Sequence, residues 1–294
     1  MRPARQIVFA SCALAVLAAA LPATAAPAPS DQIDIVYVPP KNPAHQPIYE
    51  ALKAHHALEQ TQTILSPFRL PRRLTIKVDD CDGQSNAWYE QGVITICYEY
   101  LEDVGNNAPT ETFGDFSPID ALAGPFFDVL LHEFGHALIE LLALPVLGRE
   151  EAAADQIAAY MMLQFGKDEV RRLIRGAAYA YRIDLEPPPV PPTMRAFASV
   201  HGTPAQRLYD LLCIAYGADP ALFKDFVQGG HLPRERAENC EQEYAQVAYA
   251  FHTLVRPHID RARAAKVLSR RWLPDVKAPP PHRPHPTAKK PESP

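Results

Sequence analysis

The chain has 294 residues, of which 47% are hydrophobic and 21% are charged, and its formal net charge at pH 7 is −5. This composition is that of a globular protein with enough chain for one large core or two smaller ones, and it excludes a disordered protein and a polytopic membrane protein. Proline is frequent, with 31 residues, but the 13 glycines exclude a collagen-like repeat, which needs glycine at every third position.

The N-terminal segment has the layout of a secretory signal peptide. Arg2 and Arg5 precede an apolar stretch over residues 7–21, and the small residues behind it place the expected cleavage after Ala25 or Ala26. The apolar stretch of about 15 residues is shorter than the ~20 residues that a membrane-spanning helix needs, and an uncleaved anchor is the alternative. We therefore expect an exported protein, periplasmic or secreted, without stable membrane insertion after cleavage.

The expected strands all lie in the first third of the chain. Short runs rich in β-branched and aromatic residues, bounded by turn residues, predict strands over 33–38, 74–78, 86–89 and 93–98. A helix is expected over 46–65, between the first two of these strands.

A long apolar helix follows a loop that is expected over 102–116. Ser117 and Pro118 predict the start of this helix, as its N-cap and its first residue. The Gly-Pro pair at 124–125 is expected to interrupt or kink it, so that the long apolar helix restarts there and ends near Leu142. The further segments expected to be helical are 149–166, 168–182, 194–217, 220–228 and 233–268, with breaks expected at Pro204 and Pro257.

Few strands followed by many helices indicate a mostly helical α+β fold, with a small N-terminal sheet and a helical C-terminal part. We expect one domain over 27–274, after a signal peptide over 1–26. A proline cluster at 187–192 separates two possible lobes, 27–186 and 193–274.

The C-terminal end, residues 275–294, is rich in proline, lysine and histidine. Such a segment cannot bury apolar surface, so we expect a disordered tail, with weak contact to an anionic envelope surface as the alternative. The chain between the signal peptide and this tail is more acidic than the whole, because both ends carry a positive balance. An acidic surface repels phosphate backbones, and we expect no nucleic-acid partner.

Four cysteines remain after removal of the signal peptide. Of the three possible pairings we expect the local one, Cys81 with Cys97 and Cys213 with Cys240, because each loop closed in this way contributes roughly 3 kcal/mol on the chain-entropy model. No two of these cysteines have C-x2-C spacing, so a four-cysteine metal site is not expected. Free buried thiols are the alternative.

The long apolar helix carries the sequence His132-Glu133-Phe134-Gly135-His136. Residues four apart share one face of a helix, so both imidazoles can reach one divalent ion at about 2.0–2.1 Å. Glu133 flanks that face, where it can take a proton from a metal-bound water and pass it to a leaving amine, as the general base of a metallopeptidase does. A hydrogen-bonded pair of core histidines is the alternative.

A zinc hydrolase needs a third protein ligand and one open position. The next predicted helix offers Glu151 and Asp155, four residues apart on one face, with three alanines between them that permit close packing. We expect Glu151 to bind the metal and Asp155 to accept the outer N–H of a ligating imidazole. Glu150 as the ligand is one alternative, and a solvated helix start at 150 and 151 is another.

The motif His132-Glu133-x-x-His136 followed by Glu151-x-x-x-Asp155 resembles the glutamate-type zincins, or gluzincins, the clan of thermolysin-like peptidases. The resemblance implies two histidine ligands, a catalytic glutamate, a third ligand and its supporting aspartate at these positions. The 14 residues between His136 and Glu151 are fewer than is usual in thermolysin-like proteins, so the helix hairpin must be tight.

The chain also resembles a bacterial family of metallopeptidases of unknown function. The similar segments are Asn86-Ala87-Trp88-Tyr89, 94–99, 148–151 and His201-Gly202-x-x-x-Gln206-Arg207. In thermolysin-like proteins an Asn-Ala-aromatic edge strand binds the substrate main chain, which implies that Asn86 and Ala87 bind substrate here. His201 and Tyr160 are both candidates for a donor to the transition-state oxyanion.

The sequence therefore predicts an exported zinc metallopeptidase with one Zn2+ ion. It would hydrolyse bonds of a peptide or protein substrate through a metal-activated water and the general base Glu133. The alternative is a non-catalytic, zincin-like envelope protein, stabilised by its metal, whose cleft binds a partner.

Overall fold

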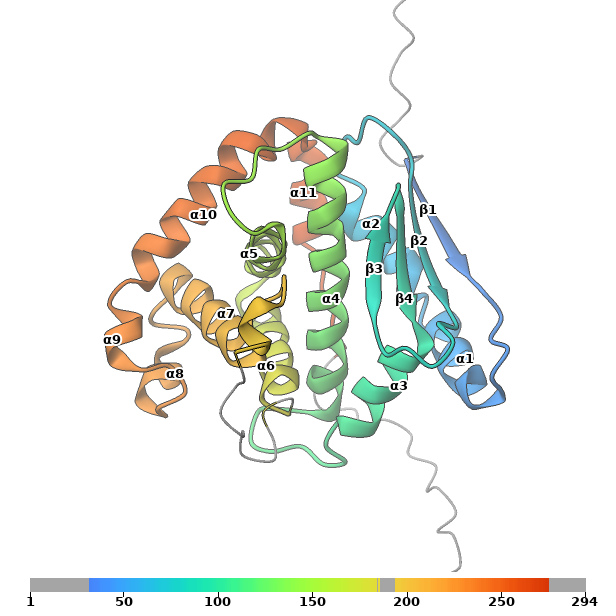
Figure 1. Ribbon diagram of the computed structural model, residues 1–294, viewed down its shortest axis with the longest axis horizontal. Coiled ribbons are helices and arrows are strands. Elements are labelled where there is room, and N and C mark those ends of the chain that lie inside the picture. Colours follow the sequence, from blue (N-terminus) through green and yellow to red (C-terminus); the bar gives the residue numbers. More distant parts are fainter. Residues whose placement is uncertain (1–31, 184, 186–193, 275–294) are drawn as a thin grey trace, which may run out of the picture.

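The computed structural model describes residues 32–183, 185 and 194–274. The expected signal peptide, the proline cluster at 187–192 and the expected tail fall outside these residues. A long central helix, α4 (Pro118–Leu141), separates a small sheet on one side from a group of helices on the other (Figure 1). The observed fold is thus α+β and mostly helical, as the sequence predicts, with the strands near the N-terminus and helices beyond them.

The sheet has four strands in the order β1-β2-β4-β3. Strands β1, β2 and β4 are parallel, and β3 pairs antiparallel with β4 at the edge of the sheet. A two-residue turn joins β3 to β4, with positive φ at Gln91 and Gly92, as tight hairpins require. The strands are β1 (Ile33–Tyr37), β2 (Leu74–Asp79), β3 (Ala87–Glu90) and β4 (Val93–Cys97).

Two segments on the sheet side differ from expectation. The helix expected over 46–65 is broken into α1 (Gln46–Ala54) and α2 (Ala57–Leu65), because His56 takes a left-handed backbone with φ of 52°. The loop expected over 102–116 is wrong in its first part, where α3 (Tyr98–Asn107) starts directly after β4. Tertiary contacts stabilise this helix, since Tyr98 is buried and its hydroxyl donates to the Val38 carbonyl at 2.7 Å.

Helix α4 begins as the sequence predicts. Ser117 is its N-cap, Pro118 is its first residue, and the backbone N–H of Ser117 donates to Asp120 Oδ2 at 2.8 Å. The interruption expected at 124–125 is wrong, because the helix runs through Pro125 without a break. Helix α6 (Lys167–Ile183) crosses there so closely that a Cβ on Gly124 would lie 2.4 Å from the α6 backbone. This packing overrides the low helix propensity of the Gly-Pro pair.

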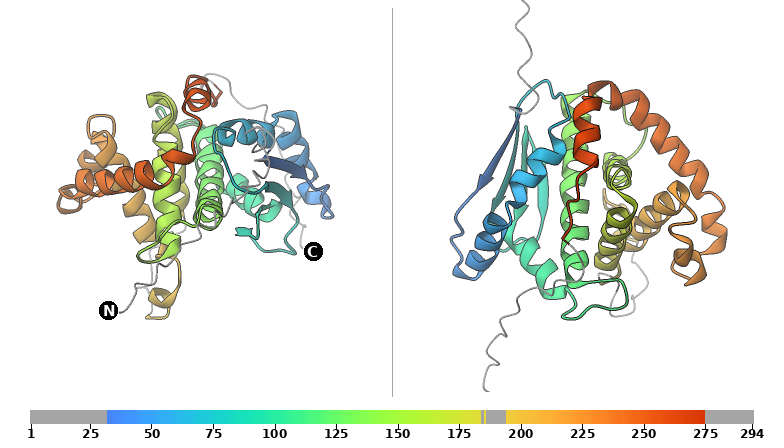
Figure 2. Two further views of the ribbon diagram at one scale, coloured as in Figure 1. Left: turned by 90° about the horizontal axis from the view of Figure 1, so that it is seen from above. Right: turned by 180° about the vertical axis from the view of Figure 1, so that it is seen from behind.

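Of the remaining helices, α6 and the helix over residues 150–162 pack against α4 on the side away from the sheet, and further helices pack against these two in turn (Figure 2). Buried side chains of the sheet, α4 and the C-terminal helices form one hydrophobic core. The segments expected over 194–217 and 220–228 are helical only in part. The helices are α5 (Glu150–Met162), α7 (Pro204–Ala218), α8 (Lys224–Gln228), α9 (Arg234–Ala237), α10 (Cys240–Leu254) and α11 (Arg261–Leu268), with single 3-10 turns at Pro43–His45, Ala196–Ala198 and Arg256–His258.

Two disulfides have the pairing expected from the sequence. Cys81 is joined to Cys97 between the ends of β2 and β4, and Cys213 of α7 is joined to Cys240 at the start of α10. None of the helices in the described part of the chain combines the length and the apolar character that crossing a bilayer requires.

Candidate metal centre

The candidate centre lies where α4 and α5 pack against each other. Gly135 faces Ala154 at this crossing, and a Cβ on Gly135 would lie 3.0 Å from the Ala154 Cα. The missing side chain therefore lets the two backbones approach closely. This approach brings Glu151, on α5, to the imidazoles of His132 and His136 on α4.

Three donor atoms converge between the two helices. His132 Nε2 lies 3.1 Å from His136 Nε2, and Glu151 Oε2 lies 3.1 Å from the first and 3.3 Å from the second. Ligand atoms 2.0–2.1 Å from a tetrahedral ion are about 3.3 Å apart, so the spacing fits one small ion. The three side chains also form one of the groups of possible metal ligands in the described residues.

Each imidazole is held from behind by a carboxylate of α5. His132 Nδ1 lies 2.7 Å from Asp155 Oδ1, and His136 Nδ1 lies 2.8 Å from Glu150 Oε1. In neutral rings the Nδ1–H groups donate to these carboxylates, which leaves lone pairs on both Nε2 atoms. Two lone pairs and the Glu151 carboxylate then face one another with no hydrogen between them. Such a set is satisfied by a cation, so the residues present fit a metal ion.

Without a cation, the same cluster holds a proton. Burial alone would lower the pKa of His132, but the hydrogen bonds to Asp155 and Glu151 outweigh it and raise the pKa to about 9. The hydrogen bond with His132 lowers the pKa of Glu151 to about 2, against the effect of burial. Glu151 is therefore an anion at neutral pH.

Glu133 follows His132 on α4, and like His132 and His136 it lines a cleft that is described below. Its side chain is buried, and burial raises the pKa of its carboxyl above the ordinary value, while His132 and His136 oppose this shift. A hydrogen bond from the Tyr89 backbone N–H also lowers it. A buried carboxylate with a raised pKa is a stronger proton acceptor than an exposed one.

Sequence reasoning did not assign a role to Arg207, which supports the centre from α7. Its guanidinium binds Asp155 through two hydrogen bonds, of 2.9 Å to Oδ2 and 2.6 Å to Oδ1. Arg207 also lies over the ring of Tyr181, whose hydroxyl donates to Asp128 at 2.7 Å. The sequence feature that could have pointed to Arg207 is the segment from His201 to Arg207. In this segment Thr203 caps α7, which places Arg207 in the first turn of the helix.

The two candidates for an oxyanion donor lie in different places. His201 Nε2 is 2.8 Å from Glu151 Oε2, and its ring stacks on that of His132 with 6.1 Å between the centroids. Tyr160 is buried, and its hydroxyl is 2.9 Å from His252 Nε2 on α10. His201 lines the cleft and Tyr160 does not.

A cleft of about 1050 Å3 opens in front of the donor group, between β3 and α3 on one side and α5 and residues 198–201 on the other. Asn86 and Ala87 line it. The Asn86 carbonyl accepts from the Cys97 N–H, so the backbone of Asn86 is turned toward β4. Because successive residues of a strand alternate, the N–H and C=O of Ala87 point to the open edge of the sheet.

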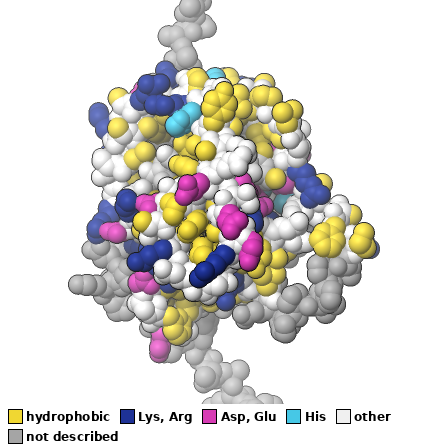
Figure 3. Space-filling view, turned by 90° about the vertical axis from the view of Figure 1, so that its left-hand side faces the viewer, with side chains coloured by type: hydrophobic (Ala, Val, Ile, Leu, Met, Phe, Trp, Pro, Cys, Tyr) yellow, Lys and Arg dark blue, Asp and Glu magenta, His cyan; other side chains and the backbone are white. Residues whose placement is uncertain are grey.

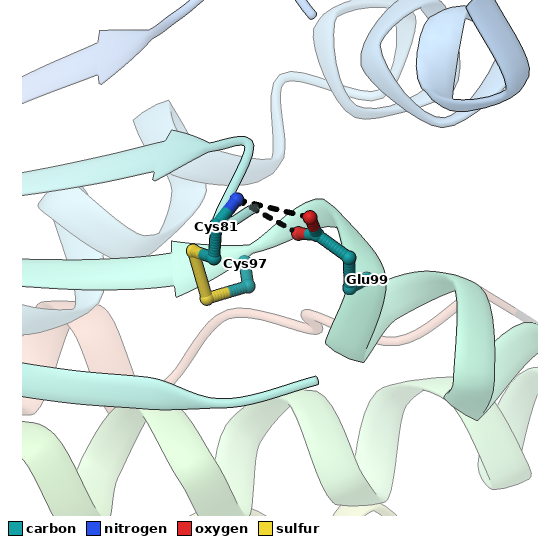
Figure 4. Close-up of side chains that lie close together, drawn as sticks. All are labelled: Cys81, Cys97 and Glu99. Atoms are coloured by element: carbon teal, nitrogen blue, oxygen red, sulfur yellow. Dashed lines mark hydrogen bonds between the residues drawn. A yellow bond between two sulfur atoms is a disulfide. The ribbon is translucent and has the colours of Figure 1, made fainter. Parts of the chain in front are cut away.

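Two other groups of possible ligands lie near the first disulfide, and their geometry has a structural explanation. Cys81 and Cys97 are bonded to each other, and Glu99 accepts the backbone N–H of Cys81 at 3.0 Å (Figure 4). Asp80 accepts the backbone N–H of Lys41 and lies 2.5 Å from His45 Nδ1. These carboxylates bind loop backbone and a neighbouring imidazole, as buried structural acids do.

Comparison with family models matched residues 37–255 to the family DUF4344, which is described as "Putative metallopeptidase". No match was found among curated proteins, and none among solved structures. The matched region is well over half of the chain and contains both helices of the candidate metal centre. The chain therefore belongs to this metallopeptidase family, which implies a metal ion and a peptide or protein substrate.

Proposed function

We propose that this protein is an exported zinc metallopeptidase, with His132, His136 and Glu151 as the ligands of one Zn2+ ion and Glu133 as the general base. The observation that carries the proposal is the convergence of three lone-pair donors at 3.1–3.3 Å, with both imidazoles held by carboxylates. Two nitrogen donors and one oxygen donor at tetrahedral spacing favour zinc over magnesium or calcium, which prefer oxygen ligands. Zinc bound there supplies Lewis-acid activation of water and of the scissile carbonyl.

Glu133 moves the proton in this proposal. Its carboxylate accepts a proton from the attacking water and then donates it to the leaving amine. The raised pKa of Glu133 suits both steps, since a weakly basic carboxylate would take the proton poorly. The Tyr89 backbone N–H hydrogen bonds to the carboxylate and so links its orientation to the edge strand β3.

Asp155 and Glu150 fix the tautomers of the two ligand histidines. By accepting the Nδ1–H groups they keep the Nε2 lone pairs directed at the metal and make these nitrogens more basic. Arg207 neutralises Asp155, which keeps that carboxylate ionised although it is largely buried.

The substrate would bind as an extended strand along the open edge of β3. The free N–H and C=O of Ala87 would pair with its main chain, and the exposed side chain of Asn86 would reach it at the start of the strand. His201, at the rim of the donor group, would donate to the oxyanion that develops on the attacked carbonyl. The two disulfides support export, because such bonds persist in oxidising compartments.

Metal analysis and cleavage assays of the chain from residue 27 onward test the proposal together. The wild type is expected to contain one zinc ion and to cleave members of a peptide library. The Glu133→Gln variant is expected to retain zinc and lose cleavage, and His136→Ala to lose zinc. A wild type without zinc would overturn the proposal. Bound zinc without Glu133-dependent cleavage would favour the non-catalytic binding protein instead.

A further inference from the structure

The loop after α2 and the segment between α10 and α11 are joined at one end of the molecule. Phe68 and Ile259 form an isolated antiparallel bridge. The Arg69 N–H donates to the His258 carbonyl at 2.7 Å, and the Asp260 N–H donates to the Pro67 carbonyl at 2.8 Å. Two segments that are distant in the sequence are therefore held next to each other by backbone hydrogen bonds.

This joint forms a hollow of about 450 Å3, lined by Arg69, Arg256 and Arg261 together with Pro257, Ile259 and Asp260. We call it the arginine hollow. The guanidinium of Arg69 donates to the Ile259 carbonyl at 3.1 Å, which holds this side chain against the wall. Among the described residues, the side chains of Arg256 and Arg261 make no ion pair or hydrogen bond.

One acid, Asp260, lies among the lining residues, and it already has a structural task. Its carboxylate accepts the Arg263 N–H at 3.0 Å and so caps α11. The hollow therefore keeps a positive excess although the whole chain has a net charge of −5. Seven other arginines in the described part of the chain are paired with acids, namely Arg72 with Glu140, Arg73 with Asp34, Arg171 with Asp225, Arg172 with Asp120, Arg175 with Asp115, Arg207 with Asp155, and Arg236 with Glu243.

More positive charge surrounds the hollow. Arg263 and Lys266 lie on α11, and Arg270 follows two residues after its end. Lys266 and Arg270 are exposed. Lys and Arg side chains gather at the upper end of the face in Figure 3, where the ends of α10 and α11 lie in Figure 1. Cations held this close repel one another, so an anion that binds between them gains both their attraction and the relief of that repulsion.

We propose that the arginine hollow binds phosphate groups. Planar guanidinium groups match the oxygens of a phosphate, with paired N–H donors on each, and three arginines line this hollow. The phosphate could belong to an anionic phospholipid headgroup or be free. The cations on α11 extend the positive surface beyond the hollow, which favours a surface that carries many phosphates over a single ion.

The double variant Arg256→Gln/Arg261→Gln tests the proposal against the matched control Lys224→Gln/Arg234→Gln. The control removes the same charge from exposed positions on α8 and α9, at the opposite end of the molecule (Figure 1). Both variants keep residues 275–294, so any contribution of the basic tail is equal. Zinc content and peptide cleavage are measured in parallel and should not change in either variant, because the hollow is separate from the metal centre.

Two probes separate the sources of the phosphate. One arm measures binding to vesicles of phosphatidylcholine with and without phosphatidylglycerol, and the other titrates inorganic phosphate and pyrophosphate by calorimetry. In the vesicle arm the wild type should bind only the anionic vesicles. The loss of each cation should weaken binding about fivefold, or roughly 25-fold for the hollow variant.

If the wild type binds anionic vesicles but neither phosphate nor pyrophosphate, and the hollow variant loses this binding, the hollow is assigned to lipid headgroups. Saturable binding of phosphate or pyrophosphate, lost in the same variant, assigns it to the free anion. The proposal is overturned if the wild type binds neither probe, or if the control variant weakens binding as much as the hollow variant does. The last result would mean that only the net charge matters.

Discussion

The two carboxylates behind the ligand histidines allow a quantitative test of the metal centre. Asp155→Asn removes the charge behind His132, and Glu150→Gln removes the charge behind His136. Loss of such an outer partner typically lowers metal affinity 10- to 100-fold, or about 1.4–2.7 kcal/mol. The Asp155 side chain is 22% exposed and the Glu150 side chain 54% exposed, so solvent screens the second interaction more. We expect about 100-fold weaker zinc binding for Asp155→Asn and about tenfold for Glu150→Gln.

The affinities are measured by competition with a chromogenic zinc chelator at constant pH, with Glu235→Gln on α9 as a control for the removal of an acidic charge. Asp155→Asn also leaves Arg207 without its charged partner. Because this pair is only partly buried, with side chains 24% and 22% exposed, the loss of folding stability should be smaller than the about 3–5 kcal/mol that breaking a fully buried pair costs. Urea unfolding of the metal-free variants separates this loss from the loss of zinc affinity. Wild-type affinity in Asp155→Asn would refute its role behind His132. A larger loss in Glu150→Gln than in Asp155→Asn would refute the argument from burial.

The remaining predictions concern pH, packing, the disulfides and the oxyanion donor. In the metal-free protein, hydrogen bonds outweigh burial and raise the pKa of His132 from 6.5 to about 9, so its stabilising contribution is complete below pH 6.5 and is lost as the pH rises through about 9. Urea midpoints should fall across this window without zinc and much less with saturating zinc, and a flat metal-free profile would contradict the cluster geometry. Gly135→Ala should lower both stability, by about 1–3 kcal/mol, and zinc affinity, because the new methyl pushes α5 away from α4; unchanged affinity in the chelator assay would count against this close crossing. Thiol titration of the unfolded mature protein should find close to none, and replacing Cys81 and Cys97 by alanine should cost about 2–4 kcal/mol in urea unfolding, whereas four free thiols would disprove the pairing. His201→Ala should retain zinc and lower kcat roughly 100-fold, and an unchanged kcat would exclude His201 as the oxyanion donor.

Much of the fold could be predicted because its signals are local. Short runs rich in β-branched or aromatic residues predict all four strands, and the Ser-Pro start predicts the first turn of α4. The predictions failed where tertiary contacts compete with local propensity. Helix α3 forms where a loop was expected, and α4 continues through Pro125, where α6 presses against Gly124. Local propensity and periodicity do not show which helix crosses at such a point, because the crossing depends on contacts between segments distant in sequence.

In the candidate metal centre, too, some features follow from local sequence and others from tertiary contacts. The four-residue spacing of His132 and His136 on a helix puts both imidazoles on one face whatever the rest of the chain does, because the helical repeat alone sets it. The choice between Glu150 and Glu151 depends on the rotation of α5 about its own axis. The close contact of Gly135 with Ala154 sets that rotation, and it places Glu151 with the two Nε2 atoms and Glu150 behind His136.

The sequence by itself thus predicted the chemistry that is local: a helix whose two histidines suit a metal ion, a glutamate beside them, an acidic helix to follow and an N-terminal segment typical of exported proteins. Only the tertiary structure decided what depends on segments distant in sequence. It brought Arg207 to Asp155 and gathered Arg69 with Arg256 and Arg261 in one hollow. The physical reason is that periodicity fixes which face of an element a side chain occupies, whereas packing between elements fixes which faces meet.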